Sequence, residues 1–132
     1  MRILIVSPDE GFVEILQAFL WDHGHEGEIA CDGLECITVL REFQPDLLVL
    51  YDDLPWGGSE GVLAWLREQP VLSEIPVILV TEPGAREHSN GGVAAPIVSR
   101  LQKPFRLNDL LVHINSKNNR PARFEFSRVG DP

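Results

Sequence analysis

Three short apolar runs rich in branched side chains stand out along the chain, at residues 2–6, 47–51 and 77–81. Runs of this kind are typical of strands that are buried on both faces of a sheet. Two further segments, at residues 26–30 and 97–101, have a weaker pattern that is compatible with strands. The sequence therefore predicts five strands.

Amphipathic segments separate these runs. The first predicts a surface helix that ends at the His23-Gly24 pair, where glycine is a common terminator. Its apolar stripe consists of Phe12, Ile15, Leu16, Phe19 and Leu20. Similar stripes predict three more helices, built on Gly33, Cys36, Ile37 and Leu40, on Val62, Trp65 and Leu66, and on Leu107, Leu110, Leu111 and Ile114. Ser59 is a candidate cap for the third helix, and Asp109 suits the first turn of the last.

Strands that alternate with helices indicate a parallel sheet, because parallel neighbours need crossover connections and these take one hand. Helices then cover both faces of the sheet. The predicted fold class is α/β: a flavodoxin-like, doubly wound, three-layer sandwich around a five-stranded parallel sheet.

Two segments depart from this alternation. Residues 82–96, where a fourth helix would be expected, contain two prolines and three glycines, which interior helix positions tolerate poorly. We expect that helix to be short or distorted. The domain is predicted to span residues 1–115, and residues 116–132 read as a linker or the start of a further module.

Chain length, hydropathy and charge exclude several classes of protein. A chain of 132 residues fits one domain, and no apolar run approaches the roughly 18 residues of a membrane span. The chain enters a strand at once, without an export signal, which predicts a cytoplasmic protein. Residues 1–99 carry 17 acidic and 4 basic side chains, so direct binding to nucleic acid or a membrane surface is not expected.

Cysteine and histidine spacings predict no metal site. Cys31 and Cys36 form neither a CxxC pair nor a metal-ligand spacing. The four histidines lack the helical i, i+4 pairing of a zinc site. They are His23, His25, His88 and His113.

Polar side chains follow the predicted strands at the edge where ligands of open α/β sheets bind. They are Ser7, Asp9 and Glu10 after the first strand, Tyr51, Asp52 and Asp53 after the third, Thr81 and Glu82 after the fourth, and Lys103 after the fifth. Carboxylates, a hydroxyl group and a lysine suggest Mg²⁺ and phosphoryl chemistry.

Five stretches, in order, carry a family resemblance: "RILIVSPDEGFVEIL", "ACDGLECI", "PDLLVLYDDLPWGG", "IPVILVT" and "LQKPF". Over residues 1–115 the chain resembles the receiver domain of bacterial two-component response regulators. The resemblance implies a domain that accepts a phosphoryl group from a histidine kinase onto an aspartate at the end of the third strand. It also implies an acidic pair that holds Mg²⁺, a Thr or Ser and a Lys that contact the phosphoryl group, and a cis bond before Pro104.

This chain has no acidic residue at the positions where that pattern has its phosphoacceptor and its acidic pair. Pro45 and Pro55 both set Tyr51 in the phosphoacceptor position. The acidic pair falls on Ser7 and Pro8. A tyrosine cannot form an acyl phosphate, and a serine with a proline provides little charge for a divalent ion. The register predicts a degenerate pocket.

Two switch positions keep their expected identities, Thr81 and Lys103. The position of the switching aromatic residue holds Arg100 instead. Glu82 follows the switch threonine, where the family has a small residue, and its carboxylate would repel a phosphoryl group. We expect the Tyr51 ring to pack over the pocket, with its hydroxyl bonded to Thr81 or Lys103.

Neighbouring acidic residues could take over the roles of the missing ones, so a second hypothesis stays open. Asp52 or Asp53 would be the phosphoacceptor, with Asp9 or Glu10 as Mg²⁺ ligands. Strand alternation directs Asp52 away from Tyr51, although a bulge could re-aim it. A third hypothesis, a flavodoxin-like cofactor binder, is disfavoured because the acidic "SPDEG" would repel phosphate.

The first hypothesis is therefore a degenerate receiver that is not an enzyme, has no cofactor and no catalytic residue, and acts by protein contact. Its expected partner is a histidine kinase, an output domain or a second copy of the chain. Trp56 is a candidate contact for such a partner.

Overall fold

A five-stranded parallel sheet runs through the middle of the molecule in the order β2-β1-β3-β4-β5. The computed structural model describes residues 1–54, 58–82 and 97–118. The strands are β1 (Arg2–Val6), β2 (Glu26–Ala30), β3 (Leu47–Tyr51), β4 (Val77–Thr81) and β5 (Ile97–Gln102). All five predicted strands are confirmed, and β5 is one residue longer than expected.

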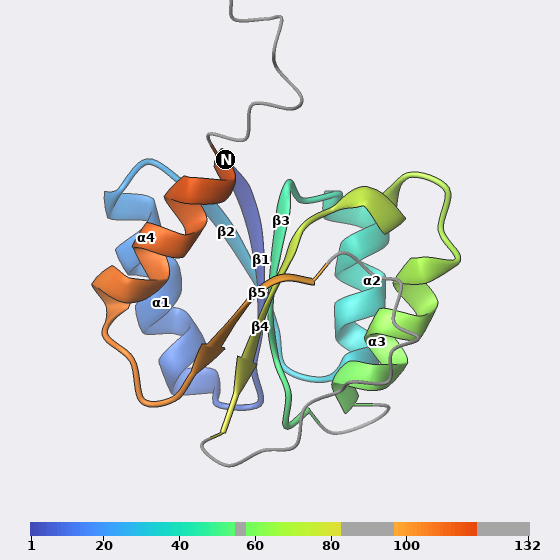
Figure 1. The fold of residues 1–132 in the computed structure, drawn as a ribbon, viewed down its shortest axis with the longest axis horizontal. Helices are drawn as coiled ribbons and strands as arrows, with labels where there is room; N and C mark the ends of the chain where they lie inside the picture. The colour runs from blue at the N-terminus through green and yellow to red at the C-terminus, as the bar shows by residue number, and fades with distance from the viewer. Residues whose placement is uncertain (55–57, 83–96, 119–132) are drawn as a thin grey trace, which may run out of the picture.

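Helices cover both faces of the sheet, with α1 and α4 on one side and α2 and α3 on the other (Figure 1). The helices are α1 (Glu10–Asp22), α2 (Gly33–Phe43), α3 (Gly58–Arg67) and α4 (Leu107–Asn118), and a 3₁₀ turn, η1 (Leu72–Glu74), follows α3. The described part of the chain thus has the predicted doubly wound, three-layer α/β architecture. Residues 83–96, Trp56 and the segment 119–132 lie outside the described residues.

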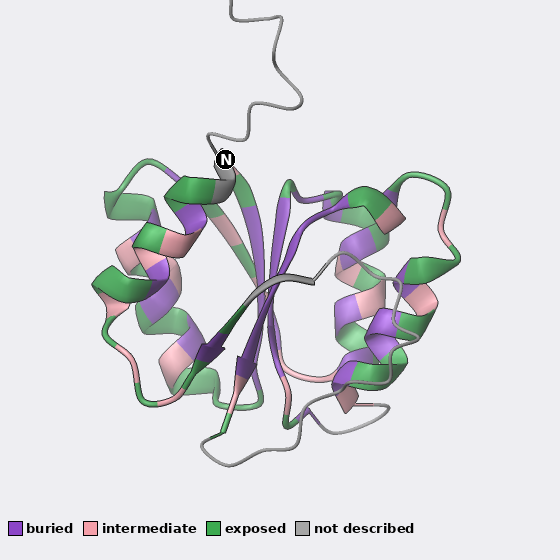
Figure 2. Cartoon of the chain, in the orientation of Figure 1, coloured by how far each residue is buried: buried purple, intermediate pink, exposed green. Residues whose placement is uncertain are grey.

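Strand alternation divides the core into two clusters. Leu48 and Leu50 pack with α2 and α3, whereas Leu47, Val49 and Tyr51 pack with α1 and α4. The central strand β3 is buried along its whole length, as Figure 2 shows. Burying one large aliphatic side chain contributes about 1.5–3 kcal/mol, so this strand anchors both layers.

The first helix differs from prediction in the face that it buries. Val13, Leu16 and Leu20 are the buried residues of α1, while Ile15 is 61% exposed. Leu16 and Leu20 were predicted correctly, but the stripe is centred one position away from Ile15. Gly24 follows the helix with φ +86°, a left-handed conformation that glycine adopts without strain, which confirms the predicted terminator.

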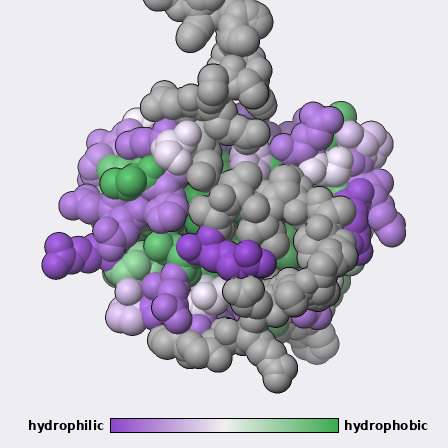
Figure 3. Space-filling view, in the orientation of Figure 1, coloured by the Kyte–Doolittle hydropathy of each residue, from purple (hydrophilic) through white to green (hydrophobic). Residues whose placement is uncertain are grey.

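Several large apolar side chains of the described residues are exposed. Those more than half exposed among the described residues are Ile15, Trp21, Leu34, Val71 and Val112. On the face in Figure 3, the described surface alternates between hydrophilic and hydrophobic areas. Single exposed apolar residues are normal in soluble folds and do not by themselves indicate a binding surface.

Candidate functional site

The carboxyl ends of β1, β3 and β4 and the segment after β5 meet at one edge of the sheet, as expected from the topology. Tyr51, the last residue of β3, belongs to the core cluster on the α1 and α4 side. Its side chain is 3% exposed. The ring makes an edge contact with Phe12 of α1, with a centroid distance of 6.0 Å. The predicted packing of the Tyr51 ring over the pocket is confirmed.

Lys103 lies at the opposite wall of the site, just after β5. Its backbone N–H donates to the carbonyl oxygen of Thr81 at 2.8 Å, which ties the end of β5 to the end of β4. The peptide bond between Lys103 and Pro104 is cis, as the resemblance predicted. The Lys103 ammonium group lies 5.1 Å from the centre of the Tyr51 ring, a cation–π geometry.

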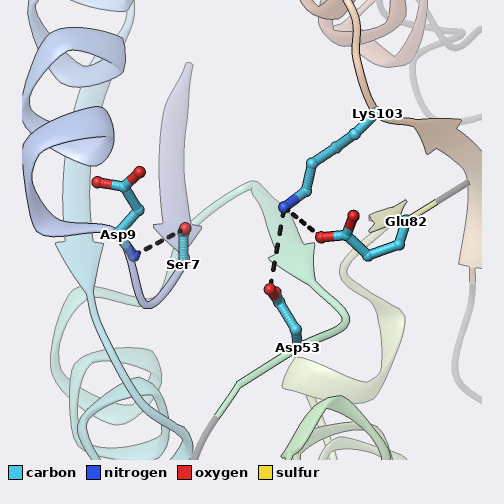
Figure 4. A network of polar contacts seen from close by, with 5 residues as sticks. All are labelled: Ser7, Asp9, Asp53, Glu82 and Lys103. Atoms are coloured by element: carbon cyan, nitrogen blue, oxygen red, sulfur yellow. Dashed lines mark hydrogen bonds and ion pairs between the residues drawn. The ribbon is translucent and has the colours of Figure 1, made fainter.

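Two carboxylates neutralise Lys103. Its Nζ atom lies 2.8 Å from Oε2 of Glu82 and 3.9 Å from Oδ2 of Asp53. Figure 4 shows the lysine side chain directed at both carboxylates from across the strand ends. The sequence predicted that Glu82 would disfavour a phosphoryl group, but it did not predict this ion pair.

A cavity of about 240 Å³ opens between these walls. Its lining residues are Ser7, Asp9, Phe12, Tyr51, Lys103, Pro104 and Phe105. Four of them, Ser7, Asp9, Tyr51 and Lys103, are predicted site residues. Phe12 and Phe105 were missed, because Phe12 was taken as core and the "LQKPF" motif drew attention only to its lysine and proline.

The Tyr51 hydroxyl group is buried and has no hydrogen-bond partner among the described residues. The expectation that it bonds Thr81 or Lys103 is therefore wrong, because Lys103 lies over the ring instead and Thr81 meets Lys103 through its backbone. Burial, and then the carboxylates of Asp53 and Asp9, raise the pKa of Tyr51 well above its ordinary value. The hydroxyl stays protonated at neutral pH.

The segment after β1 is held by local hydrogen bonds. The buried Ser7 hydroxyl accepts the Asp9 backbone N–H at 3.2 Å. Oδ1 of Asp9 accepts the Phe12 backbone N–H at 3.0 Å, so Asp9 is the N-cap of α1. Pro8 is exposed, and Glu10 is the first, exposed residue of the helix.

Asp52 lies on the other side of β3. Its Oδ1 atom accepts a hydrogen bond from the Ser59 hydroxyl at 2.5 Å. Tyr51 faces α1, so the two side chains take opposite directions, as strand alternation predicted. Ser59 lies inside α3, one residue after its start, so the expectation that it caps this helix is wrong.

The cavity lining does not include Thr81 or Arg100, the residues at the threonine and aromatic switch positions. Arg100 is exposed on β5 and pairs in register with Leu79. Within the described ranges, no three His, Cys, Asp or Glu side chains gather closely enough to hold a metal ion. Nor does any described helix have the length and apolarity to cross a membrane.

The comparisons with known proteins point to one family. The sequence model of the family described as the response regulator receiver domain matches residues 3–115 of this chain. The chain is 30% identical over 115 residues to the probable transcriptional regulator ycf29 of Pyropia yezoensis, a match over 87% of this chain and 52% of that protein. It is 26% identical over 132 residues to the DNA-binding response regulator MtrA of Mycolicibacterium smegmatis, over 98% of this chain and 57% of MtrA.

Solved structures of response regulators have the same fold. A putative response regulator from Chloroflexus aurantiacus matches with a TM-score of 0.79 at 25% identity, over 90% of this chain and 98% of that chain. The chemotaxis response regulator CheY4 of Vibrio cholerae, at 23% identity, shares the fold with a TM-score of 0.78, over 87% and 96% of the two chains. The chain spans about half the length of the curated relatives it matches.

Proposed function

The chain belongs to the response regulator receiver domain family of two-component signalling, and from this we propose that it is a degenerate receiver that acts without phosphorylation. Receiver domains are signalling domains, and this one is proposed to work by protein contact rather than by catalysis. The observation that carries the proposal is Tyr51, which occupies the end of β3 with its ring packed into the site.

Tyr51 stands where the family resemblance implies an aspartate. A phenol cannot form an acyl phosphate, and the raised pKa of Tyr51 keeps it from being a nucleophilic phenolate. The ring also fills space between Phe12 and the Lys103 ammonium group, where a phosphoryl group would need room.

Lys103 supports the same conclusion. In an active receiver its positive charge would be available to the phosphoryl group, whereas here the Glu82 carboxylate binds it at 2.8 Å. A phosphoryl group would have to displace this carboxylate or approach it, and like charges repel. The positive charge of Lys103 is already neutralised by side chains of the domain.

The residues after β1 fit Mg²⁺ poorly. A magnesium ion prefers carboxylate oxygens in octahedral geometry. The Ser7 hydroxyl is a neutral ligand that already accepts the Asp9 N–H, and Pro8 has no ligand atom. Asp9 binds the first turn of α1. A bound Mg²⁺ ion therefore has no part in the proposed function.

The proposed partners are proteins: a histidine kinase, an output domain or a second copy of this chain. Because MtrA is named a DNA-binding response regulator and is longer than this chain, an output module is a reasonable partner. Any DNA contact would lie in that module, since residues 1–99 are strongly acidic. The expected location is the cytoplasm.

One observation favours the alternative of an active phosphoacceptor. Asp53 lies 3.9 Å from Lys103 and is partly exposed, so its carboxylate is near the one retained cation of the site. Asp52 is a weaker candidate, because its carboxylate is bonded to Ser59 on the other side of β3.

Amide NMR spectra with Mg²⁺, followed by beryllofluoride or acetyl phosphate, test the proposal. We expect no saturable shifts at residues 51–53 and 81–82. Saturable shifts that vanish in Asp53→Asn or Asp52→Asn would contradict it and support the alternative. A triple variant, Ser7→Asp, Pro8→Asp and Tyr51→Asp, is the matched positive control, since it returns the three carboxylates that the resemblance implies.

A further inference from the structure

The cavity beside Tyr51 has an aromatic lining. The rings of Phe12, Tyr51 and Phe105 form its walls together with Pro104. Its volume is about 240 Å³. An apolar cavity of about 150 Å³ is enough to hold benzene. This cavity can therefore take a single aromatic ring with a short substituent, and the ring would pack against other rings in edge or offset contacts.

The charges around the cavity favour a cation. Asp9 is in its wall, and Asp53 and Glu82 lie beside Lys103. These three carboxylates outnumber the one ammonium group of the site, which already pairs with Glu82. An anion entering the site would meet an excess of negative charge, whereas an ammonium group could pair with Asp9, and the ring faces would attract it further.

Tyr51 contributes its ring to the cavity rather than its hydroxyl group. The hydroxyl is buried and has no hydrogen-bond partner among the described residues. Because it is shielded from solvent, a molecule in the cavity would meet the ring of Tyr51 and not this group.

We propose that this cavity binds a small aromatic amine in its protonated form, with the ring against the wall formed by Phe12, Tyr51 and Phe105 and the ammonium group directed at Asp9. The inference rests on the proposed function, because a site that still took Mg²⁺ and a phosphoryl group would need the same space. Binding would couple the β1–α1 connection to the segment after β5, since the cavity joins Ser7 and Asp9 to Lys103 and Phe105.

Three probes with the same phenol ring and different charge test the inference: tyramine, 4-ethylphenol and 4-hydroxyphenylacetate. Each is titrated into the ¹⁵N-labelled chain, and dissociation constants are taken from the amide shifts of residues lining the cavity. We expect tyramine to bind with a dissociation constant of about 1 mM, in the range of fragment-sized ligands. 4-Ethylphenol should bind more weakly, and 4-hydroxyphenylacetate most weakly.

Asp9→Asn is the decisive variant. Asparagine caps helices about as well as aspartate, so this change removes the charge and keeps the hydrogen bond to Phe12. We expect tyramine to bind about threefold more weakly, in the range of a partly exposed ion pair, and 4-ethylphenol to be unaffected. Asp32→Asn is the matched control, because Asp32 caps α2 in the same way and does not line the cavity.

Several outcomes would overturn the inference: no saturable shifts with any probe, tightest binding by 4-hydroxyphenylacetate, or equal weakening of tyramine binding by Asp9→Asn and Asp32→Asn. The beryllofluoride titration on the same sample separates the two proposals. If the probes fail and beryllofluoride also fails, only the amine site is wrong. If beryllofluoride binds at residues 51–53, the degenerate receiver itself is wrong.

Discussion

The ammonium nitrogen of Lys103 lies 2.8 Å from a carboxylate oxygen of Glu82, across the ends of β5 and β4. Both side chains are partly exposed, at 31% and 52%. The pair joins two neighbouring strand ends whose backbones are also linked by the Lys103 N–H and the Thr81 carbonyl. The negative charge nearest to Lys103 is thus provided by a side chain of the domain.

Glu82→Gln should remove this ion pair with little loss of stability. Exposed pairs typically contribute about 0.2–1 kcal/mol, because water and salt screen them and two long side chains lose freedom. We expect the free energy of unfolding in urea to fall by less than about 1 kcal/mol in low salt. The difference from the unmodified chain should shrink further in 1 M NaCl, where the screening length is about 3 Å.

Glu14→Gln is the control for that measurement, since Glu14 is exposed on α1 and forms no ion pair with another described residue. It should change neither the free energy nor its salt dependence. A loss above about 2 kcal/mol in Glu82→Gln would show that the pair is a structural element of the sheet edge rather than a neutralising contact.

Tyr51→Phe should stabilise the domain. The change removes a buried hydroxyl group without a hydrogen-bond partner and leaves the ring contacts with Phe12 and Lys103 in place. Leaving such a group unsatisfied costs about 1–3 kcal/mol, so we expect the free energy of unfolding to rise by about 1 kcal/mol. Urea unfolding followed by circular dichroism measures it.

Ser59→Ala is the comparison variant, because it removes a buried hydroxyl group that does form a hydrogen bond. Ser59 is also buried, but its hydroxyl donates to Asp52. Its removal should lower the free energy of unfolding by about 1–2 kcal/mol, because a charge-assisted hydrogen bond to the Asp52 carboxylate is lost. If Tyr51→Phe destabilised the chain by a similar amount, the Tyr51 hydroxyl would have a partner that the described contacts do not include.

The sheet was predictable because strand alternation is a strict geometric rule. Knowing that Tyr51 ends β3 was enough to direct Asp52 to the other face, where it meets α3. The buried faces of the helices were harder to predict. An apolar stripe on α1 spans several positions, and which of its edges is buried depends on how the helix lies on the sheet, so Ile15 was predicted to be buried and Val13 was overlooked.

The site was predictable as a set of positions and less so as a set of contacts. The family resemblance, through the spacing of the prolines and the lysine motif, identified Tyr51 and Lys103 from the sequence. The direction of the Glu82 side chain and the unpaired state of the Tyr51 hydroxyl depend on the rotamers of these and neighbouring side chains. No residue pattern encodes those quantities, which is why the ion pair was missed and the tyrosine hydrogen bond was predicted wrongly.

Cys36 should make the domain less stable at high pH. Burial, with smaller effects from Asp32 and Glu35, raises the pKa of its thiol from 9.0 to about 12. Between these values the unfolded chain releases the proton and the folded chain keeps it, so stability falls as pH rises above 9. We expect the free energy of unfolding, measured in urea with a reducing agent, to decrease from pH 8.5 to 10.

Cys36→Ala should flatten that decrease, although the loss of packing lowers its stability at every pH. The comparison stays below pH 10 because the raised pKa of Tyr51 adds a slope of the same sign above its ordinary value of 10.0. Equal slopes in the variant and the unmodified chain would mean that the Cys36 thiol is not protected from ionisation by the fold.

His25 should make the domain less stable in mild acid. Its side chain is 6% exposed, and its Nδ1 atom lies 3.2 Å from the amino group of Met1. Burial and then the charge of that amino group lower the pKa of His25 below 6.5, against a weaker opposing effect of a hydrogen bond with Asn115. As pH falls below 6.5 the unfolded chain takes up a proton before the folded chain does, so stability is lost in that range.

The measurement for His25 is the free energy of unfolding in urea between pH 7.5 and 5.0, for the unmodified chain and for His25→Gln. Glutamine can keep polar contacts with Met1 and Asn115 but does not titrate, so the variant should lose less stability on acidification. The carboxylates titrate in both proteins, and their contribution cancels in the difference of the two slopes. A variant that loses as much stability as the unmodified chain would show that His25 is protonated in the fold as easily as in the unfolded chain.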